Sequence, residues 1–238
     1  GRGRGGADPA GRGRGMITLW HVPQSRSFRV LWFLHEAGLP YDLRLMSFAG
    51  RALRDPAFLA VSPAGRVPAA EIDGRAMFES GAILEYLCET RAPGLGRPAG
   101  HPERAGWLEW LHYGETIGQH LAQLTQQHIV LREDWMRSPT VMKLEAMRLG
   151  RVLQGLERAV AAQDWLLPGG FSAVDVQAGY GVILAQRFVS LEALPAIAAY
   201  AARLAARPAY RAALAADGAA EIYTRPFYPA PDPVPDGG

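Results

Sequence analysis

Residues 62–87 read SPAGRVPAAEIDGRAMFESGAILEYL, and this stretch decides the fold of the first part of the chain. Residues 67–72 and 75–78 have the length of two short strands, and the Asp-Gly pair at 73–74 is typical of a tight hairpin turn. Over residues 80–90 the apolar side chains recur at helical spacing. The stretch therefore predicts a strand, a turn, a second strand and a closing helix.

The residues upstream alternate short apolar segments with helical patterns. The apolar segment at 16–22 predicts a buried strand, and residues 25–37 show helical spacing that ends at the Gly-Leu-Pro of 38–40. Residues 41–45 predict another strand, and residues 55–61 predict a short helix. Together with the hairpin and its closing helix, this order predicts one α/β domain.

After a Pro/Gly-rich linker at residues 92–102 the strand signals vanish and only helical patterns follow. We expect helices at residues 103–128, 138–163, 172–189, 194–206 and 208–216. The predicted organisation is an extension at 1–15, an α/β domain at 16–91, the linker, an all-helical domain at 103–217 and a Pro-rich tail at 218–238. We expect the tail to be extended and docked through Tyr223, Phe227 and Tyr228.

The composition is that of an ordinary globular protein, with 49% hydrophobic and 20% charged residues over 238 positions. No apolar run has the length of a membrane-spanning helix, so we expect a cytoplasmic protein without a membrane partner. The single cysteine, Cys88, excludes an internal disulfide, a CxxC redox pair and a multi-cysteine metal site. Its apolar neighbours on the predicted helix indicate an inert core thiol.

Residues 1–15 differ from the rest of the chain, with seven glycines, four arginines and one aspartate. They carry a charge of +3 against a total of +2, so the remainder carries −1 and is not basic. The segment has the composition of RNA-binding Gly/Arg tracts but contains no aromatic residue for base stacking. We expect a disordered extension, a functional start at Met16 and no nucleic-acid partner.

Ser172 and Asp175 form a capping-box pattern at the start of a predicted helix, and Phe171 and Val176 are spaced as the hydrophobic staple around it. A serine cap of this kind stabilises a helix by about 1 kcal/mol. The pattern indicates a structural role and no chemistry.

The runs SPAGRVPA at 62–69 and FESGAILEYL at 78–87, together with the capping box, resemble the glutathione S-transferase family over residues 16–216. The resemblance implies a thioredoxin-like N-terminal domain that binds glutathione and an all-α C-terminal domain that carries most of the hydrophobic-substrate site. It also implies glutathione as co-substrate, no metal, a homodimer and a role in detoxification. The chain is most similar to serine-type or related bacterial classes of the family.

The resemblance implies that Arg66, Val67, Pro68, Glu79 and Ser80 bind glutathione. Taken alone, a Val-Pro pair at a strand start favours a trans proline at a sheet edge; the resemblance implies a cis bond, which would turn the Val67 backbone toward an extended peptide ligand. Ser80 at a helix N-terminus suits the γ-glutamyl carboxylate, and Glu79 suits its ammonium. On local sequence alone, an N-cap and a first-turn charge explain the same pair. Arg66 stands where the family often has a basic residue for the glycyl carboxylate.

A transferase must stabilise the thiolate of glutathione, and the turn between the first strand and the first helix is the place for this. The turn has no tyrosine, and the family's cysteine position falls on Arg26, which excludes mixed-disulfide chemistry. Serine-using members carry the hydroxyl a few residues before an arginine, a pattern that Ser25 and Arg29 fit. Ser25 is therefore the predicted catalytic residue, with Ser27 as its rival and Arg26 as an electrostatic helper. The alternative is that Ser25 only caps the helix.

Polar side chains recur on one face of the first long helix, at Tyr113, Thr116 and His120. We predict that they line the pocket for the hydrophobic substrate, and the alternative is a polar stripe at a domain interface. His21 ends a strand and His35 lies on the first helix. Neither histidine has the neighbours of a metal site.

The leading hypothesis for function is a glutathione transferase that activates the thiolate for attack on a hydrophobic electrophile. The same thiolate would serve a glutathione-dependent peroxidase or an isomerase. The alternative from another class is a non-catalytic binding or interaction module that keeps the fold. Because a pure scaffold needs no γ-glutamyl pocket, the Glu79, Ser80 and Val67-Pro68 set favours the enzyme.

Overall fold

The computed structural model describes residues 16–231, so the extension predicted at residues 1–15 and the end of the Pro-rich tail lie outside the described residues. In chain order, with short 3-10 or π turns marked η, the elements are β1 (Ile17–His21), α1 (Phe28–Glu36), β2 (Tyr41–Leu45), η2 (Ala52–Arg54), α2 (Pro56–Leu59), β3 (Ala69–Ile72), β4 (Arg75–Phe78), α3 (Ser80–Thr90), η3 (Pro93–Leu95), α4 (Arg104–Thr125), η4 (Gln126–Val130), η5 (Asp134–Met136), α5 (Pro139–Val160), α6 (Ala173–Ala185), α7 (Pro195–Ala206) and α8 (Pro208–Ala216). The strands and helices predicted from the sequence are confirmed, with shifts at their ends.

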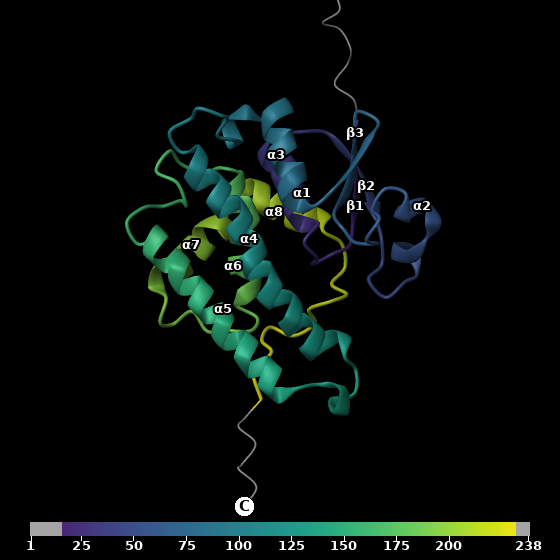
Figure 1. The fold of residues 1–238 in the computed structure, drawn as a ribbon, viewed down its shortest axis with the longest axis vertical. Coiled ribbons are helices and arrows are strands. Elements are labelled where there is room, and N and C mark those ends of the chain that lie inside the picture. Colours follow the sequence, from purple (N-terminus) through teal and green to yellow (C-terminus); the bar gives the residue numbers. More distant parts are fainter. Residues whose placement is uncertain (1–15, 232–238) are drawn as a thin grey trace, which may run out of the picture.

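The strands form one mixed sheet at the N-terminal side of the molecule, in the order β2-β1-β3-β4 (Figure 1). β1 runs parallel to β2 and antiparallel to β3, and β3 pairs antiparallel with β4. Ile17, Leu19 and His21 of β1 are buried, and the residues between them are only partly buried. This period of two gives the strand one face directed to the core.

The hairpin between β3 and β4 is confirmed in its turn residues. Asp73 and Gly74 both have positive φ, at 55° and 78°. Two successive residues in this region form the kind of turn that matches the twist of an antiparallel pair, and the Asp-Gly sequence tolerates it. The turn therefore sets the register that places Ala69 of β3 opposite Phe78 of β4.

Helix α1 lies between the sheet and the helices that follow. Its residues 28–34 are all buried, and it packs on β1, α3, α6 and α8. A helix that is buried on every side needs apolar residues around its whole circumference, which the buried part of its sequence, FRVLWFL, provides except at Arg29. This one buried arginine requires a partner, which the second half of the chain supplies.

In the second half, α4 and α7 pack on α6, and α5 packs on α4 and α7, with α4 and α5 side by side (Figure 1). Residues 173–182 of α6 are all buried. Two glycines allow α4 and α6 to approach closely: a Cβ atom on Gly114 would lie 2.7 Å from Gln177 Cγ, and one on Gly181 would lie 2.8 Å from Ile117 Cγ2. This close contact brings side chains of α6 up to the sheet domain.

The predicted cap at the start of α6 is present through Asp175. One carboxylate oxygen accepts the backbone N–H of Ser172 at 2.9 Å. The other accepts the N–H of Leu166 and the hydroxyl of Tyr200, both at 2.9 Å. Burial raises the pKa of the Asp175 carboxyl to about 6.

Beyond α8 the chain turns back toward β1, as the yellow coil of Figure 1 shows. Tyr223 and Tyr228 are buried, which confirms their predicted docking, and they pack on Phe188. The predicted docking of Phe227 is wrong, because 42% of this residue is exposed. Among the described residues, no helix is long and apolar enough to cross a membrane.

Candidate active site

The turn between β1 and α1 presents one serine to a cleft and buries another. Helix α1 begins at Phe28, later than predicted, so Ser25 precedes the N-cap residue Ser27. Ser27 is fully buried, whereas Ser25 is partly exposed and lines a cleft of about 330 Å³. Of the two predicted hydroxyls, only that of Ser25 is placed where a ligand in the cleft could reach it.

Gln24, in this turn, has a left-handed backbone conformation, with a φ of 62°. Its carbonyl oxygen accepts the hydroxyl of Tyr180 at 2.8 Å, and its N–H donates to the Asp217 carboxylate at 3.1 Å. Its side-chain oxygen accepts the N–H groups of Ile222 and Tyr223, each at 2.9 Å. A positive φ in a non-glycine residue persists only where its surroundings hold it, and here α6 and the C-terminal segment do so.

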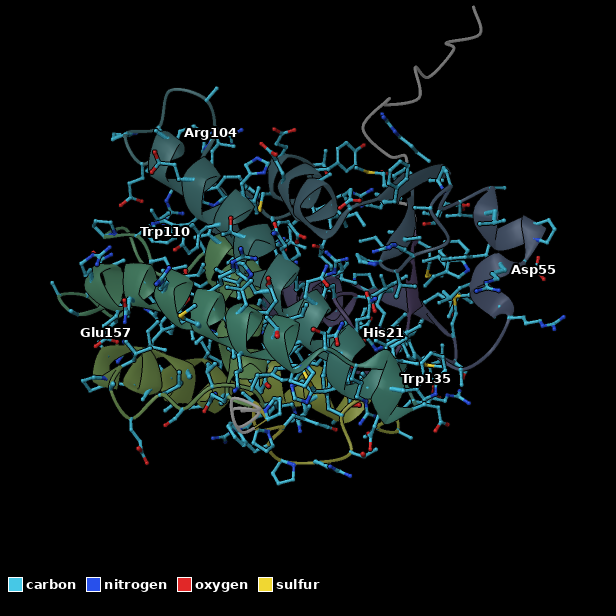
Figure 2. All side chains as sticks on the ribbon, turned by 60° about the horizontal axis from the view of Figure 1, so that its bottom comes forward. His21, Asp55, Arg104, Trp110, Trp135 and Glu157 are labelled. Carbon is cyan, nitrogen blue, oxygen red and sulfur yellow. The ribbon has the colours of Figure 1, made fainter. Side chains whose placement is uncertain are left out.

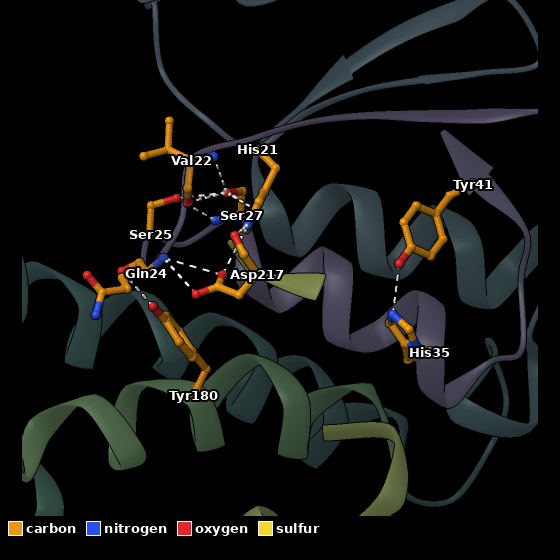
Figure 3. A network of polar contacts seen from close by, with 9 residues as sticks. All are labelled: His21, Val22, Gln24, Ser25, Ser27, His35, Tyr41, Tyr180 and Asp217. Atoms are coloured by element: carbon orange, nitrogen blue, oxygen red, sulfur yellow. Dashed lines mark hydrogen bonds and ion pairs between the residues drawn. The ribbon is translucent and has the colours of Figure 1, made fainter. Parts of the chain in front are cut away.

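The Ser25 hydroxyl is the first member of a buried polar network, shown in Figure 3. Ser25 Oγ lies 2.7 Å from Ser27 Oγ, and Ser27 Oγ lies 2.7 Å from Nδ1 of His21. On the far side of the ring, His21 Nε2 lies 3.0 Å from the Asp217 carboxylate and 3.1 Å from its carbonyl oxygen. His21 is fully buried inside the molecule, in contrast to Trp135 at its surface (Figure 2).

The five residues predicted to bind glutathione lie together at the end of β4 and the start of β3. Arg66, Val67, Pro68, Glu79 and Ser80 all line one small cavity of about 30 Å³. The Val67–Pro68 peptide bond is cis, as the family resemblance implied, and Glu79 has a φ of 71°. Arg26 lines both this cavity and the Ser25 cleft, as does Arg66, so the two spaces adjoin.

The loop that leads to Val67 is held by Ser62, which the sequence analysis missed. The Ser62 hydroxyl donates to the carbonyl oxygen of Arg66 at 2.7 Å and accepts its N–H at 3.2 Å. Ser62 is buried. Serine near a turn often bonds the neighbouring backbone, and this is the signal that could have identified it.

Ser80 is tied to the helical domain by groups that sequence reasoning also missed. Its oxygen accepts N–H groups from Arg29 and from Gln177 of α6, each at 3.1 Å. Arg29 is 1% exposed and forms an ion pair with Glu115 of α4, which Arg26 also contacts at 2.7 Å. Burial lowers the pKa of Arg29; burial alone would raise the pKa of Glu115, but the two arginines lower it. An arginine within the apolar sequence of α1 was the available signal for this pair.

The residues predicted for the hydrophobic-substrate pocket do not line the cleft. Tyr113 donates to the carbonyl oxygen of Val152 at 2.9 Å, and His120 lies 2.6 Å from Glu145, so both contact α5; Thr116 is exposed. The face of α4 that lines the cleft consists of Gly118, Leu121, Ala122, Thr125 and, just beyond, Gln126. Two positions along a helix turn it by roughly 200°, so His120 and Gly118 point in nearly opposite directions. Tyr113 and His120 thus belong to the α4–α5 contact.

Cys88 and His35 lie apart from the cleft. Burial raises the pKa of the Cys88 thiol to about 12, which agrees with the inert core thiol predicted. His35 lies 2.8 Å from the hydroxyl of Tyr41 on β2, away from the Ser25 network (Figure 3).

A further cavity of about 460 Å³ lies behind the first turn, between α6, α8 and the C-terminal segment. It includes Gln24 and Tyr180 but neither Ser25 nor any of the five predicted glutathione-binding residues. The hydroxyl and the predicted peptide-binding groups therefore share the other side of the turn.

Comparison with known proteins supports the reading of the motifs. A family model described as the N-terminal domain of glutathione S-transferase matches residues 25–90. Glutathione S-transferase 3 of Schizosaccharomyces pombe is 27% identical over 243 residues, which cover 92% of this chain and 98% of that protein. Maleylacetoacetate isomerase of Pseudomonas aeruginosa is 30% identical over 204 residues, which cover 83% of this chain and 95% of that protein.

Among solved structures, the chain is similar to a theta class glutathione S-transferase of Xanthomonas axonopodis pv. citri that has glutathione bound. The sequence identity is 27% and the TM-score is 0.75, over 83% of this chain and 96% of that chain. The predicted fold class, a thioredoxin-like sheet domain followed by a helical domain, is confirmed.

Proposed function

Because the chain belongs to the glutathione S-transferase family, we propose that it is a glutathione transferase that activates the thiol of glutathione for attack on a hydrophobic electrophile. One observation carries the proposal. The Ser25 cleft and the cavity lined by the five predicted glutathione-binding residues adjoin at Arg26 and Arg66. An extended tripeptide spanning the two would have its cysteinyl sulfur beside a hydroxyl.

The γ-glutamyl end of glutathione carries a carboxylate and an ammonium. The Ser80 oxygen already accepts two N–H groups, so its single O–H proton is available to donate to the carboxylate. The N-terminus of α3 adds backbone N–H groups and a favourable dipole. Glu79, which immediately precedes this helix, complements the ammonium.

The cysteinyl part of glutathione would lie along Val67, whose backbone N–H and C=O can pair with an extended peptide. Arg66 would neutralise the glycyl carboxylate. These groups position the thiol, and they need no change in the fold because Ser62 already holds the loop.

Ser25 would stabilise the thiolate. A thiol with a pKa of about 8.5 must be lowered by roughly two units to be mostly ionised at neutral pH, which requires about 2.7 kcal/mol. A hydrogen bond to an anion supplies about 1.5 to 3 kcal/mol, and the nearby N-terminus of α1 supplies about 0.3 to 1 kcal/mol. The hydroxyl and the helix end are thus sufficient.

The electrophile would occupy the remainder of the cleft. Its walls carry the apolar side chains of Phe48, Leu121, Val130, Leu184 and Ile222. Such a surface favours a hydrophobic substrate, and the arginines at its edge favour one that gains negative charge during the reaction.

The test is Ser25→Ala, assayed for conjugation of glutathione to a chlorodinitrobenzene. We expect kcat/KM to fall about 10- to 100-fold, because one hydrogen bond to the thiolate is lost, with little change in the Kd for glutathione. Ser190→Ala, which removes an exposed hydroxyl, is the matched control and should leave the activity unchanged. Equal activity in both variants would remove Ser25 from the mechanism.

The reaction type is tested by a panel that includes an organic hydroperoxide and a cis double bond activated by carbonyl groups. The second substrate is included because a relative of 30% identity is named an isomerase. A chain that fails to bind immobilised glutathione would instead be a non-catalytic module. We further propose a cytoplasmic homodimer with a role in detoxification, whose assembly sedimentation would test against the chain mass of 25.8 kDa.

A further inference from the structure

In the polar network behind Ser25, the chemistry of the groups determines which atom donates and which accepts at each hydrogen bond. Nε2 of His21 faces the carbonyl and carboxylate oxygens of Asp217, and both of these only accept hydrogen bonds. In a neutral imidazole, Nε2 therefore carries the proton. Nδ1 is then bare, and it accepts the hydroxyl proton of Ser27.

The same logic continues outward to the cleft. The carbonyl oxygen of Val22 lies 3.3 Å from Ser27 Oγ, but Nδ1 of His21 is closer, at 2.7 Å, and takes the one hydroxyl proton. At the contact between the two serines it is therefore Ser25 that donates and Ser27 that accepts. The N–H of Val22 donates to Ser27 Oγ as well, at 3.2 Å, which fills its acceptor positions. Ser25 thus turns its proton inward. One of its two acceptor positions takes the N–H of Ser27 at 3.2 Å, and the other is left to receive the hydrogen of a thiol.

We propose that His21, paired with Asp217, receives the proton of the glutathione thiol through the hydroxyls of Ser25 and Ser27. This inference rests on the proposed transferase function. The S–H bond breaks, its proton binds Ser25, the Ser25 proton passes to Ser27, and the Ser27 proton passes to Nδ1 of His21. The products are a thiolate and an imidazolium, with no proton gained or lost.

The transfer reverses every hydrogen bond in the chain. Nδ1 of His21 now donates to Ser27, Ser27 donates to Ser25, and the Ser25 hydroxyl donates to the thiolate that it has just helped to form. The imidazolium lies against the Asp217 carboxylate, which the N–H of Gln24 also contacts at 3.1 Å. His21, Ser27 and Asp217 act only through Ser25, so they are positioning residues.

Asp217 is the anionic partner of His21 in this interior. Two tyrosines, Tyr180 of α6 and Tyr210 of α8, interact electrostatically with its carboxylate. Burial raises the pKa of both, so they stay neutral around pH 7. Arg29 of α1 lies close enough to interact with Tyr180, but its charge is paired with Glu115. The Asp217 carboxylate therefore lies in direct contact with the ring that gains the positive charge in the transfer.

The experiment compares His21→Asn with His35→Asn. Both remove a histidine of the sheet domain that contacts a hydroxyl, but only the first belongs to the Ser25 network. The ultraviolet absorbance of the thiolate is titrated with pH in the glutathione complex of each variant. We expect the midpoint to rise by about one pH unit in His21→Asn and to stay unchanged in His35→Asn. The Kd for S-methylglutathione, which has no thiol proton, should not change.

Asp217→Asn keeps an oxygen for the His21 N–H while it removes the negative charge, and Ser27→Ala interrupts the relay without touching the ring. Both substitutions should raise the midpoint of the thiolate titration. If His21→Asn does not fold, these two variants test the relay in its place. Unchanged midpoints in variants that bind S-methylglutathione would overturn the relay and leave the transferase intact. A wild-type chain that binds no glutathione would remove both proposals.

Discussion

The two halves of the candidate site are held in place by different parts of the molecule. In the strand half, residues 62–80, the backbone is held by its own neighbours: Ser62 bonds Arg66, and β3 pairs with β4. Ser80, at the end of this half, also bonds Gln177 of α6. The turn half, residues 21–27, is held by Asp217 and Tyr223, which lie more than 190 positions later in the chain. The backbone of the half proposed to bind glutathione is thus held locally, whereas the half proposed to activate the thiol depends on the C-terminal segment.

We expect the largest loss of stability from substitution of Glu115, because its carboxylate pairs with Arg26 of the turn half and with Arg29, which bonds Ser80 of the strand half. Glu115→Ala removes the partner of the buried Arg29, whose side chain also bonds Ser80, and of Arg26 in the turn. Leaving a buried guanidinium unpaired should lower the free energy of unfolding by about 3 to 4 kcal/mol, near the low end for buried pairs because the Glu115 side chain is 39% exposed. Denaturant unfolding measures this. Glu109→Ala, on the exposed face of α4, should change stability by less than about 0.5 kcal/mol.

A pH dependence of stability should arise outside both halves, at Asp175. Burial raises the pKa of this carboxyl to about 6, above its ordinary 3.8, so the folded state holds the proton more tightly than the unfolded state. The stabilisation is complete below pH 3.8 and is lost as pH rises through about 6, with a total of up to about 3 kcal/mol.

Urea unfolding at several pH values between about 4 and 7 tests this dependence. The difference in stability between the wild type and Asp175→Asn should shrink as pH rises. Asp134→Asn, whose side chain is 97% exposed, should show a constant difference. A constant difference for Asp175→Asn as well would contradict the assignment.

The smallest expected losses of stability come from two substitutions, each of which affects one half of the site. Asp217→Ala orphans the N–H of Gln24 and weakens the contact of His21, which should cost about 2 kcal/mol of stability. Ser62→Ala loses two bonds to the Arg66 backbone, which should cost about 1 kcal/mol. Only Ser62→Ala should weaken binding of S-methylglutathione, measured by calorimetry. If Asp217→Ala weakens this binding equally, the proposed difference between the two halves is wrong.

The strand half could be predicted from the sequence because its determinants are adjacent in the chain. The Asp-Gly turn fixes the hairpin, and the predicted motif residues line one cavity. The start of α1 was placed too early, at residue 25. Helical spacing alone cannot show that Gln24 bonds the C-terminal segment and holds residues 23–27 in a turn.

The remaining predictions were wrong or missing where the site depends on contacts between segments that are far apart in the sequence. His21 read as the end of a strand, and no periodic pattern connects it with Asp217. The face of α4 that lines the cleft was misjudged because Tyr113 and His120 find their partners on α5. An amphipathic pattern shows that a face is polar, but the partner helix decides whether that face meets substrate or another helix.

The separation of 196 positions between His21 and Asp217 has a consequence for synthesis of the chain. Translation produces the first strand and its turn early, together with the serine proposed to activate the thiol. The carboxylate that completes their surroundings leaves the ribosome only after α1 to α8 of the described residues have been made. A nascent or prematurely terminated chain would therefore carry the peptide-binding edge without a finished proton path.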